Sequence, residues 1–436
     1  MKLRVSNFTR IKQAEIEIDG ITVIAGENNT GKSTIGKILF SLFNSMNNLD
    51  EKIDGKRTEE IWNFNFKILR RSIFMHTNNH DVLDNQSSTK ASIKRIADKL
   101  TEMLFQEVDN ENIYSMVCDL LRMNNILDDE LQIEEIADKI IKLAISRIKS
   151  TNIVLAQEII SRFFENIFNE QINCKCLQSK DLEALLELTI KDKKNTVSFM
   201  NNRCNNYKAQ YSILHEAFYI DNPFIIDEID EDREFDENKI KEHILSKLSN
   251  NDGIMDGIFD AVIAREKLDD IYSILNKVVK GNISNNDGFG MEVENLSEPI
   301  KLSNLSTGLK SFVIIKMLLE KGILKEKDVL ILDEPEIHLH PEWQILYAEI
   351  IVLLQKLFDL SIVVTTHSLN FLEAIEFFSE KHSIDKKSRY YLAKSDGEMS
   401  EFEDVTNDTS KIYSQMIQAS ILLDKLKYEK EINDNE

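Results

Sequence analysis

The segment that most constrains the fold is Gly26-Glu27-Asn28-Asn29-Thr30-Gly31-Lys32-Ser33, which fits the pattern G-x-x-x-x-G-K-[ST]. A β-branched run at 21–25 precedes it, and a helical pattern from about 33 to 43 follows. A glycine-rich turn between a strand and a helix points backbone N–H groups and the positive end of the helix dipole at an anion. The sequence therefore predicts a phosphate-binding loop, in which Lys32 reaches the phosphates and Ser33 binds Mg²⁺.

A second segment supplies carboxylates. The apolar run of Asp328-Val-Leu-Ile-Leu-Asp333-Glu334-Pro335 predicts a buried strand that ends in Asp333 and Glu334. Ligands of open α/β sheets bind beyond the carboxyl ends of the strands, so both side chains are expected at the phosphate site. We expect Asp333 to hold Mg²⁺ through water and Glu334 to orient the attacking water.

Three further segments lie near this acidic strand end. Leu305-Ser306-Thr307-Gly308-Leu309-Lys310 opens a helix, where Ser-Thr-Gly could also be only a helix cap. Glu336-Ile337-His338-Leu339-His340-Pro341 follows the acidic residues, and its His-x-His pair also suggests a metal site. The apolar run from Ser361 ends in Thr366-His367-Ser368, where the histidine could also be purely structural.

In this order and spacing, the motifs resemble those of ABC-class ATPases, in the soluble branch that includes SMC, Rad-type repair and OLD-type defence ATPases. The resemblance implies ATP and Mg²⁺ as cofactors and a dimer or larger assembly, because the Ser306 segment, an altered LSGGQ signature, contacts the nucleotide of the opposite subunit. It places the 336–341 segment in a dimer-contacting loop, so a metal site is rejected.

The implied catalytic residues are Glu334 and His367, the second contacting the γ-phosphate. The implied metal ligands are Ser33 and Asp333, and the implied nucleotide contacts are Gly26, Asn28, Asn29, Thr30, Gly31, Lys32, Ser33, Thr34, Ser306, Thr307 and Gly308. The glutamine of the family's Q-loop finds no match.

The spacing of the motifs also predicts the domain organisation. The fold class is α/β, an ATPase head with a mostly parallel sheet and a large helical insertion. Residues 1–45 and 285–403 are expected to form the head, and 404–436 a C-terminal helix with an acidic tail. Residues 46–284 are expected to form a mostly helical insertion, in which a strand near 218–226 could return to the head.

Composition limits the functional classes. The net charge is −22 over 436 residues, which argues against general binding of polyanions. A basic helical face formed by Lys90, Lys94, Arg95 and Lys99 leaves contact with DNA possible, although a solvated face is the plainer interpretation. Neither a signal sequence nor a membrane-spanning run is apparent, so no membrane partner and a cytoplasmic location are expected.

Within this branch, the segments E-I-H-L-H-P-E-W-Q and T-T-H-S-L-N-F-L-E-A-I-E look like those of standalone ATPases from bacterial anti-phage systems. The resemblance is greatest to the PtuA-like ATPases of Septu systems, which also accompany some retrons and whose partner is an HNH nuclease. It implies an ATPase that controls a partner nuclease, since only 69 residues follow His367 and no nuclease domain is visible. Two alternatives stay open: a nucleotide-gated scaffold with little turnover, and an SMC- or Rad-like DNA-repair ATPase.

Overall fold

The computed structural model describes residues 1–76, 86–107, 110–124, 129–175, 182–230, 238–249, 268–285, 288–294 and 296–433. They form two compact units: Met1–Asn47 with Ile160–Glu436, and Asn48–Ile159. The segment predicted as one helical insertion, 46–284, is therefore divided. Its first part is a separate helical unit, and its later part contributes strands and helices to the larger unit.

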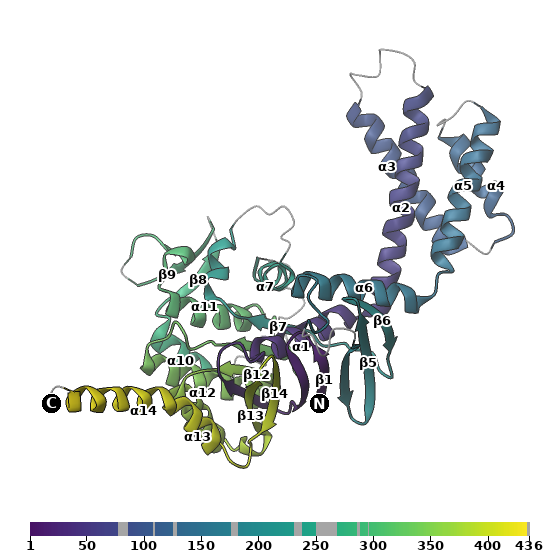
Figure 1. The fold of residues 1–436 in the computed structure, drawn as a ribbon. Coiled ribbons are helices and arrows are strands. Elements are labelled where there is room, and N and C mark those ends of the chain that lie inside the picture. Colours follow the sequence, from purple (N-terminus) through teal and green to yellow (C-terminus); the bar gives the residue numbers. More distant parts are fainter. Residues whose placement is uncertain are drawn as a thin grey trace. The chain divides into compact units, whose positions relative to one another are not determined.

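The larger unit is built on one long sheet (Figure 1), whose strands are ordered β6-β5-β4-β1-β2-β14-β13-β3-β12-β11-β7. Strands β13, β3, β12, β11 and β7 run parallel to one another, and β2, β1, β4, β5 and β6 pair antiparallel in succession. Between these two groups, β14 pairs antiparallel with β13 and parallel with β2. The strands are β1 (Lys2–Phe8), β2 (Ile11–Glu17), β3 (Ile21–Gly26), β4 (Ala184–Ile190), β5 (Lys193–Met200), β6 (Arg203–Lys208), β7 (Ala217–Ile220), β11 (Val329–Asp333), β12 (Ser361–Thr366), β13 (Ser388–Asp396) and β14 (Met399–Asp404). The predicted α/β fold with a parallel, motif-bearing sheet is confirmed.

Both faces of the parallel strands are buried, which explains their unbroken apolar runs. In β11, Leu330 and Leu332 belong to one core cluster, and Val329 and Ile331 belong to the cluster on the other face. Successive side chains of a strand point to opposite sides, so a run without alternation requires cover on both. The described helices supply that cover.

One face packs against α1 (Lys32–Met46) and the later part of α6 (Asn152–Phe168). The helices that cover the other face include five between residues 239 and 381. These are α7 (Lys239–Ser249), α10 (Asp269–Val278), α11 (Thr307–Glu320), α12 (Pro341–Phe358) and α13 (Leu369–Lys381). Two short 3-10 helices, η2 (Pro223–Glu228) and η3 (Leu302–Asn304), lie against each other, and η2 also contacts α11. A third, η4 (Asp385–Lys387), precedes β13. A separate small sheet is ordered β10 (Ile300–Lys301), β9 (Phe289–Glu292), β8 (Asn282–Asn285).

The C-terminal helix, α14 (Ser410–Asn433), starts next to the phosphate-loop segment. Ile412 is buried in the core, and the side-chain amide of Gln415 donates to Glu27 Oε1 at 3.2 Å. Further along, Ile421 and Leu422 are more than half exposed. The first turns of α14 therefore pack on the larger unit, while its later apolar side chains face solvent.

The smaller unit is helical and has its own core. It contains α2 (Leu49–His76), α3 (Gln86–Glu107), α4 (Ile113–Met123) and α5 (Glu130–Ile148). Isoleucine, leucine and alanine at helical spacing, such as Leu69, Ile93, Leu100 and Ile140, form a buried cluster. Figure 1 shows α2 and α3 as a hairpin and α4 and α5 as a second pair. No helix in the described parts of the chain is long and apolar enough to cross a membrane.

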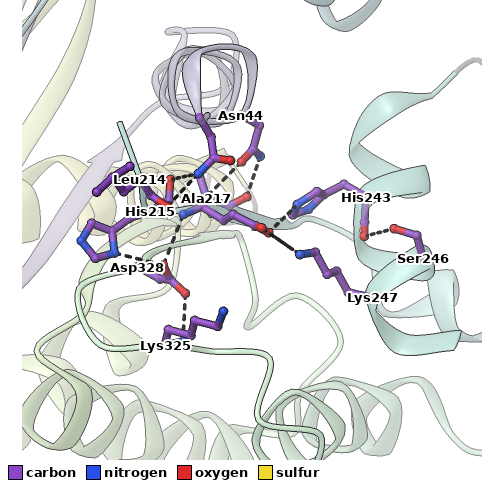
Figure 2. A network of polar contacts seen from close by, with 11 residues as sticks. Asn44, Leu214, His215, Ala217, His243, Ser246, Lys247, Lys325 and Asp328 are labelled. Atoms are coloured by element: carbon purple, nitrogen blue, oxygen red, sulfur yellow. Dashed lines mark hydrogen bonds and ion pairs between the residues drawn. The ribbon is translucent and has the colours of Figure 1, made fainter. Parts of the chain in front are cut away.

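A polar network ties together the amino ends of β7 and β11 (Figure 2). The Asn44 side chain exchanges two hydrogen bonds with the backbone of Ala217, at 2.7 and 3.1 Å. Asp328 accepts from the backbone N–H groups of Glu216 and Lys325 and lies 3.5 Å from His215. These contacts hold α1 and two parallel strands in register from the end of the sheet opposite the carboxyl ends of the strands.

Within this network, we expect Glu216 to stabilise the fold in an acid-sensitive way. His243 and Lys247 lie 3.3 and 2.7 Å from its carboxylate and, opposed by burial, lower its pKa to about 2. The stabilisation is therefore complete above the ordinary pKa of 4.5 and is lost as the pH falls toward 2. Glu216→Gln should lower the free energy of unfolding by about 1–2 kcal/mol at pH 7, measured by urea denaturation.

The acid dependence separates this role from a packing defect. The difference between wild type and Glu216→Gln should shrink as the pH falls below 4.5. Glu130 is the control, because Arg122 also lowers its pKa, but its side chain is 55% exposed, against 33% for Glu216. Glu130→Gln should cost less, since solvent screens the pair. An equal loss in both variants, or a loss at Glu216 that ignores pH, contradicts the assignment.

Candidate active site

The predicted site residues meet at the carboxyl ends of neighbouring parallel strands. In the order β3-β12-β11-β7, the phosphate loop follows β3, His367 follows β12, and Asp333 ends β11. The register sets Asp333 beside Thr365 and Thr366 beside Ala25. Residues about 300 positions apart in sequence are therefore brought to one edge of the sheet, which is where open α/β sheets bind ligands.

The phosphate loop is tightly constrained by its neighbours. Gly26 has a φ of 148°, and a Cβ placed there would lie 2.3 Å from the Ala393 carbonyl oxygen, so only glycine fits. The Lys32 ammonium donates to the carbonyl oxygens of Gly26 at 3.0 Å and of Glu27 at 2.7 Å. Burial lowers the pKa of Lys32, and the nearby carboxylates of Glu334 and Asp333 oppose that shift. The loop thus holds one cation within a cradle of backbone groups.

Asp333 is the centre of a hydroxyl network. Its Oδ1 accepts from Ser33 Oγ at 3.0 Å and from Thr365 Oγ1 at 2.5 Å, and its Oδ2 accepts from the Tyr219 hydroxyl at 2.6 Å. Burial, followed by the charge of Asp333, raises the pKa of Tyr219 far above its usual range, so the phenol stays a donor. Three hydroxyl groups from α1, β12 and β7 therefore fix the orientation of one carboxylate.

The donor chemistry around Asp333 fits Mg²⁺. The Ser33 hydroxyl and the Asp333 carboxylate are hard oxygen ligands, the type that Mg²⁺ prefers. At the end of β7, Asp221 adds a second carboxylate, whose pKa is raised by burial and by Asp333 and lowered by Lys37. The chain has no glutamine at this strand end, where the sequence reads Ile220-Asp221-Asn222.

Glu334 and His367 form the predicted catalytic pair. The Glu334 Oε1 atom lies 3.0 Å from His367 Nε2. Glu334 has a φ of 51°, in the left-handed region that non-glycine residues seldom adopt, and its N–H donates to Thr365 Oγ1 and to the Thr365 carbonyl oxygen. Burial and Lys32 lower the pKa of His367, opposed by Glu334, which favours a neutral imidazole at neutral pH.

Glu336, which the sequence placed only in a dimer-contacting loop, holds the backbone of His367 in place through hydrogen bonds. Its side chain is 4% exposed, and its Oε1 accepts from Thr366 Oγ1 at 2.5 Å and from the His367 N–H at 2.9 Å. Burial raises the pKa of Glu336, while these two hydrogen bonds lower it. Gln344 extends the support: its amide donates to the Glu336 and Leu339 carbonyl oxygens and accepts from Ser368.

A separate pocket of about 500 Å³ surrounds the N-terminus of α11. Its lining consists of Ser306, Thr307, Gly308, His338, His340 and Trp343. A Cβ on Gly308 would lie 2.9 Å from the His338 carbonyl oxygen and 3.3 Å from the Trp343 ring, so this position must be small. The predicted signature segment and the loop after β11 therefore build one pocket, which Lys32, Asp333, Glu334 and His367 do not line.

Lys310, at a position where the sequence departs from the usual signature, does not line this pocket. Its side chain is 3% exposed and points away from the pocket lining toward η2, where its ammonium pairs with Asp227 at 2.6 Å and donates to the Ser303 carbonyl oxygen. The same ammonium lies 5.2 Å from the centroid of the Phe224 ring. The lysine thus connects the start of α11 to the segment that follows β7.

The remaining predicted residues lie in the phosphate loop and the first turn of α1. Thr30 is buried and donates to the Glu27 carbonyl oxygen at 2.8 Å, Asn28 and Asn29 are exposed, and Thr34 is half-buried. Sequence reasoning missed Tyr219, Asp221, Thr365 and the role of Glu336. For the first three, the usable signal was that each lies at the end of an apolar run expected to be a buried strand.

The comparison with protein families identifies the class. The sequence profile of the AAA ATPase domain family matches residues 1–372, most of the chain, and the chain belongs to this family. It is therefore an ATPase with a phosphate-loop nucleotide site.

The chain is also similar to solved structures of SMC heads. The SMC head domain from Thermotoga maritima matches with 11% identity and a TM-score of 0.41, over 93% of this chain and 98% of that one. An SMC head bound to the C-terminal winged-helix domain of ScpA matches with 12% identity and a TM-score of 0.44, over 92% and 97%. An SMC head with an extended coiled coil from Pyrococcus furiosus matches with 11% identity and a TM-score of 0.33, over 96% and 98%. These overlaps are loose, and the family assignment depends on the sequence profile.

Proposed function

We propose that two copies of this ATPase pair head to head, and that each ATP is held between the phosphate loop of one copy and the Ser306–Gly308 pocket of the other. The supporting observation is the division of the site. The phosphate loop, Asp333, Glu334 and His367 gather at the carboxyl ends of the strands, while Ser306 and Gly308 line a pocket that none of them enters. In a pair, each copy would supply the part of the nucleotide site that the other copy lacks.

Within such a pair, each residue has a chemical role that its position supports. Lys32 and the backbone N–H groups of its loop bind phosphate oxygens, and Ser33 and Asp333 hold Mg²⁺. Bound Mg²⁺ supplies positive charge against the phosphate oxygens. Glu334 accepts a proton from the attacking water, and His367, fixed by Glu336, contacts the γ-phosphate from the neighbouring strand end.

We further propose that the chain acts in the cytoplasm as the ATPase subunit of a bacterial anti-phage complex, similar to the PtuA-like ATPases of Septu systems. Opening and closing of the paired heads would control a partner nuclease of the HNH type. The support is the segment resemblance around Glu336-Ile337-His338 and Thr366-His367-Ser368, together with the absence of a nuclease motif in the chain's own sequence.

The first test is the native mass of the purified chain with and without ATP and Mg²⁺, measured together with its ATPase rate. A dimer or larger species that tightens with ATP supports head pairing, and a nuclease that co-purifies should change its activity when the heads are locked together. A strict monomer under both conditions removes the paired-head mechanism. DNA-stimulated hydrolysis without any nuclease would instead favour a DNA-repair ATPase.

Ser306→Arg tests the pocket directly. An arginine at this position would fill the pocket that the second copy's phosphates should enter, so the variant should bind ATP but stay monomeric with ATP, and its turnover should fall at least about tenfold. Ser146→Arg, the same change at an exposed position of α5, is the control and should pair normally. Wild-type pairing and turnover in Ser306→Arg would refute the role of the pocket.

A nucleotide-gated scaffold is the second candidate function, and one observation favours it. Lys310 is buried against Asp227, so its charge does not line the pocket as a polar signature residue would. Weak turnover would follow from such a reduced signature. Tight ATP binding with near-zero turnover, in a chain that still pairs, would support the scaffold over the active ATPase cycle.

A further inference from the structure

The end of the α2–α3 hairpin carries an unusual concentration of positive charge. Residues 61–76 and 86–97 contain six basic residues and no acidic one, in a chain whose net charge is −22. The six are Lys67, Arg70, Arg71, Lys90, Lys94 and Arg95, and we call them the basic hairpin end. The connecting segment, 77–85, contributes Asp81 and Asp84 to the sequence and lies outside the described residues.

The spacing of these charges works against helix stability. Lys67 with Arg71, and Lys90 with Lys94, are like charges four residues apart, which lie on the same face of a helix and repel each other. In α5 of the same unit, by contrast, residues four apart carry opposite charges. Lys139 pairs with Glu135 at 2.5 Å, and Lys142 pairs with Asp138 at 2.7 Å. Asp98, four residues after Lys94 and three after Arg95, is the one acidic residue a helical turn from these six charges. Local stability therefore explains the charges of α5 but does not account for Lys67, Arg70, Arg71 and Lys90.

Five of the six charges at the hairpin end are also left without an opposite charge. Lys67, Arg71, Lys90, Lys94 and Arg95 are exposed and form no ion pair with any described residue. Several other cations of the unit are paired with a carboxylate: Lys56 with Glu59, Arg57 with Asp54, Arg122 with Asp119, and Arg147 with Glu60. Exposed, unpaired and mutually repelling cations are available to an anionic partner at no cost in internal contacts.

The two helices place these charges together. Lys67, Arg70 and Arg71 lie toward the C-terminal end of α2, and Lys90, Lys94 and Arg95 lie toward the N-terminal end of α3. Because α2 and α3 pack side by side as a hairpin, both groups lie at its connected end (Figure 1). Each group extends over about 6–8 Å of helix axis. Duplex DNA presents one charge per about 1.7 Å of its axis, so several phosphates lie within reach of the patch.

We propose that the basic hairpin end binds the phosphate backbone of double-stranded nucleic acid without reading its sequence. An anionic membrane is less well matched, because surface helices that bind membranes combine cations with exposed apolar side chains. Among the residues whose side chains are described, the exposed large apolar ones of this unit are Tyr114, Met123, Leu131, Ile153 and Val154, and none lies in 61–72 or 90–97. This surface is independent of the head pairing proposed above.

The test is the salt dependence of binding between the full chain and a fluorescein-labelled DNA duplex, followed by anisotropy. The triple variant Lys67→Ala/Arg71→Ala/Lys94→Ala should bind at least about tenfold more weakly near physiological salt. The slope of log affinity against log salt concentration should become shallower by about 2 to 3, roughly 1 for each phosphate contact removed. The variant removes repulsion, so its thermal unfolding temperature should not fall.

A matched control removes the same charge from paired positions of the same unit. Lys56→Ala/Lys139→Ala/Lys142→Ala should keep the wild-type slope, because these cations are neutralised by their own helices. Equal slopes for wild type and the Lys67 triple variant would overturn the proposal, and so would equal losses in both triple variants. Binding only to phosphatidylserine vesicles, with none to the duplex, would assign the surface to a membrane instead. Neither ATPase rate nor native mass enters this test, so it can fail while head pairing stands.

Discussion

Replacing Glu334 with glutamine is expected to lower ATP turnover by about 10²- to 10³-fold, the usual contribution of a positioned general base. Glutamine preserves the volume and one carbonyl oxygen but cannot accept the proton from water. The contacts that hold Asp333 come from Ser33, Thr365 and Tyr219, and none of them involves the Glu334 side chain. Binding of ATP should therefore be retained.

Because binding persists while hydrolysis stops, Glu334→Gln should also accumulate the paired form with ATP. The measurements are steady-state phosphate release and native mass in ATP and Mg²⁺. Glu326→Gln is the control: this glutamate lies before the other end of β11, is 70% exposed, and should leave both quantities unchanged. Hydrolysis at the wild-type rate in Glu334→Gln would remove this residue from the catalytic role.

The second large effect is expected at Glu336, which contacts the histidine segment rather than the nucleotide. Glu336→Ala removes the acceptor of the hydrogen bonds from Thr366 Oγ1 and from the His367 N–H. The backbone that carries His367 would shift, and displacement of a catalytic group by about 1 Å can cost about 10²-fold in rate. We expect kcat to fall about 10- to 100-fold while KM for ATP changes little, since Lys32 and Ser33 are untouched.

Glu336→Gln distinguishes positioning from charge. The amide oxygen can accept the same two hydrogen bonds, so kcat should recover to within about threefold of wild type. Steady-state kinetics of both variants give the difference in kcat between them, and thermal unfolding checks that both are folded. If the glutamine variant is as slow as the alanine variant, the charge of Glu336 matters and the positioning role is wrong. If both keep wild-type kcat, the contact is only structural.

The chemistry-bearing segments could be predicted because each is short and local. Gly26 to Ser33 encodes a turn that must precede a helix, and the apolar runs at 328–332 and 361–366 encode buried strands whatever surrounds them. The structure has these strands as β11 (Val329–Asp333) and β12 (Ser361–Thr366). The predicted helix at about 341–358 is α12, which begins at Pro341 and ends at Phe358.

The strands between 184 and 208 could not be predicted in the same way. This segment belongs to the insertion predicted to be mostly helical, but Ala184–Ile190 is β4, which pairs antiparallel with β1. Its sequence, Ala-Leu-Leu-Glu-Leu-Thr-Ile, combines strong helix formers with a β-branched end, so local propensity favours neither state. Pairing with β1, formed some 180 residues earlier in the chain, decides the outcome.

The phosphate loop, the acidic strand end and the α/β class can be predicted from the sequence, because each depends on a pattern within a few residues, and the order of the motifs can be followed directly along the chain. Which side chains meet depends on the tertiary structure. The hydrogen bonds of Tyr219 and Thr365 to Asp333, the support of His367 by Glu336, and the burial of Lys310 against Asp227 join segments 30 to more than 100 residues apart, or depend on how η2 packs on α11. Such contacts follow from the order and register of the strands. Long-range packing of the sheet determines both, and no local sequence pattern predicts them.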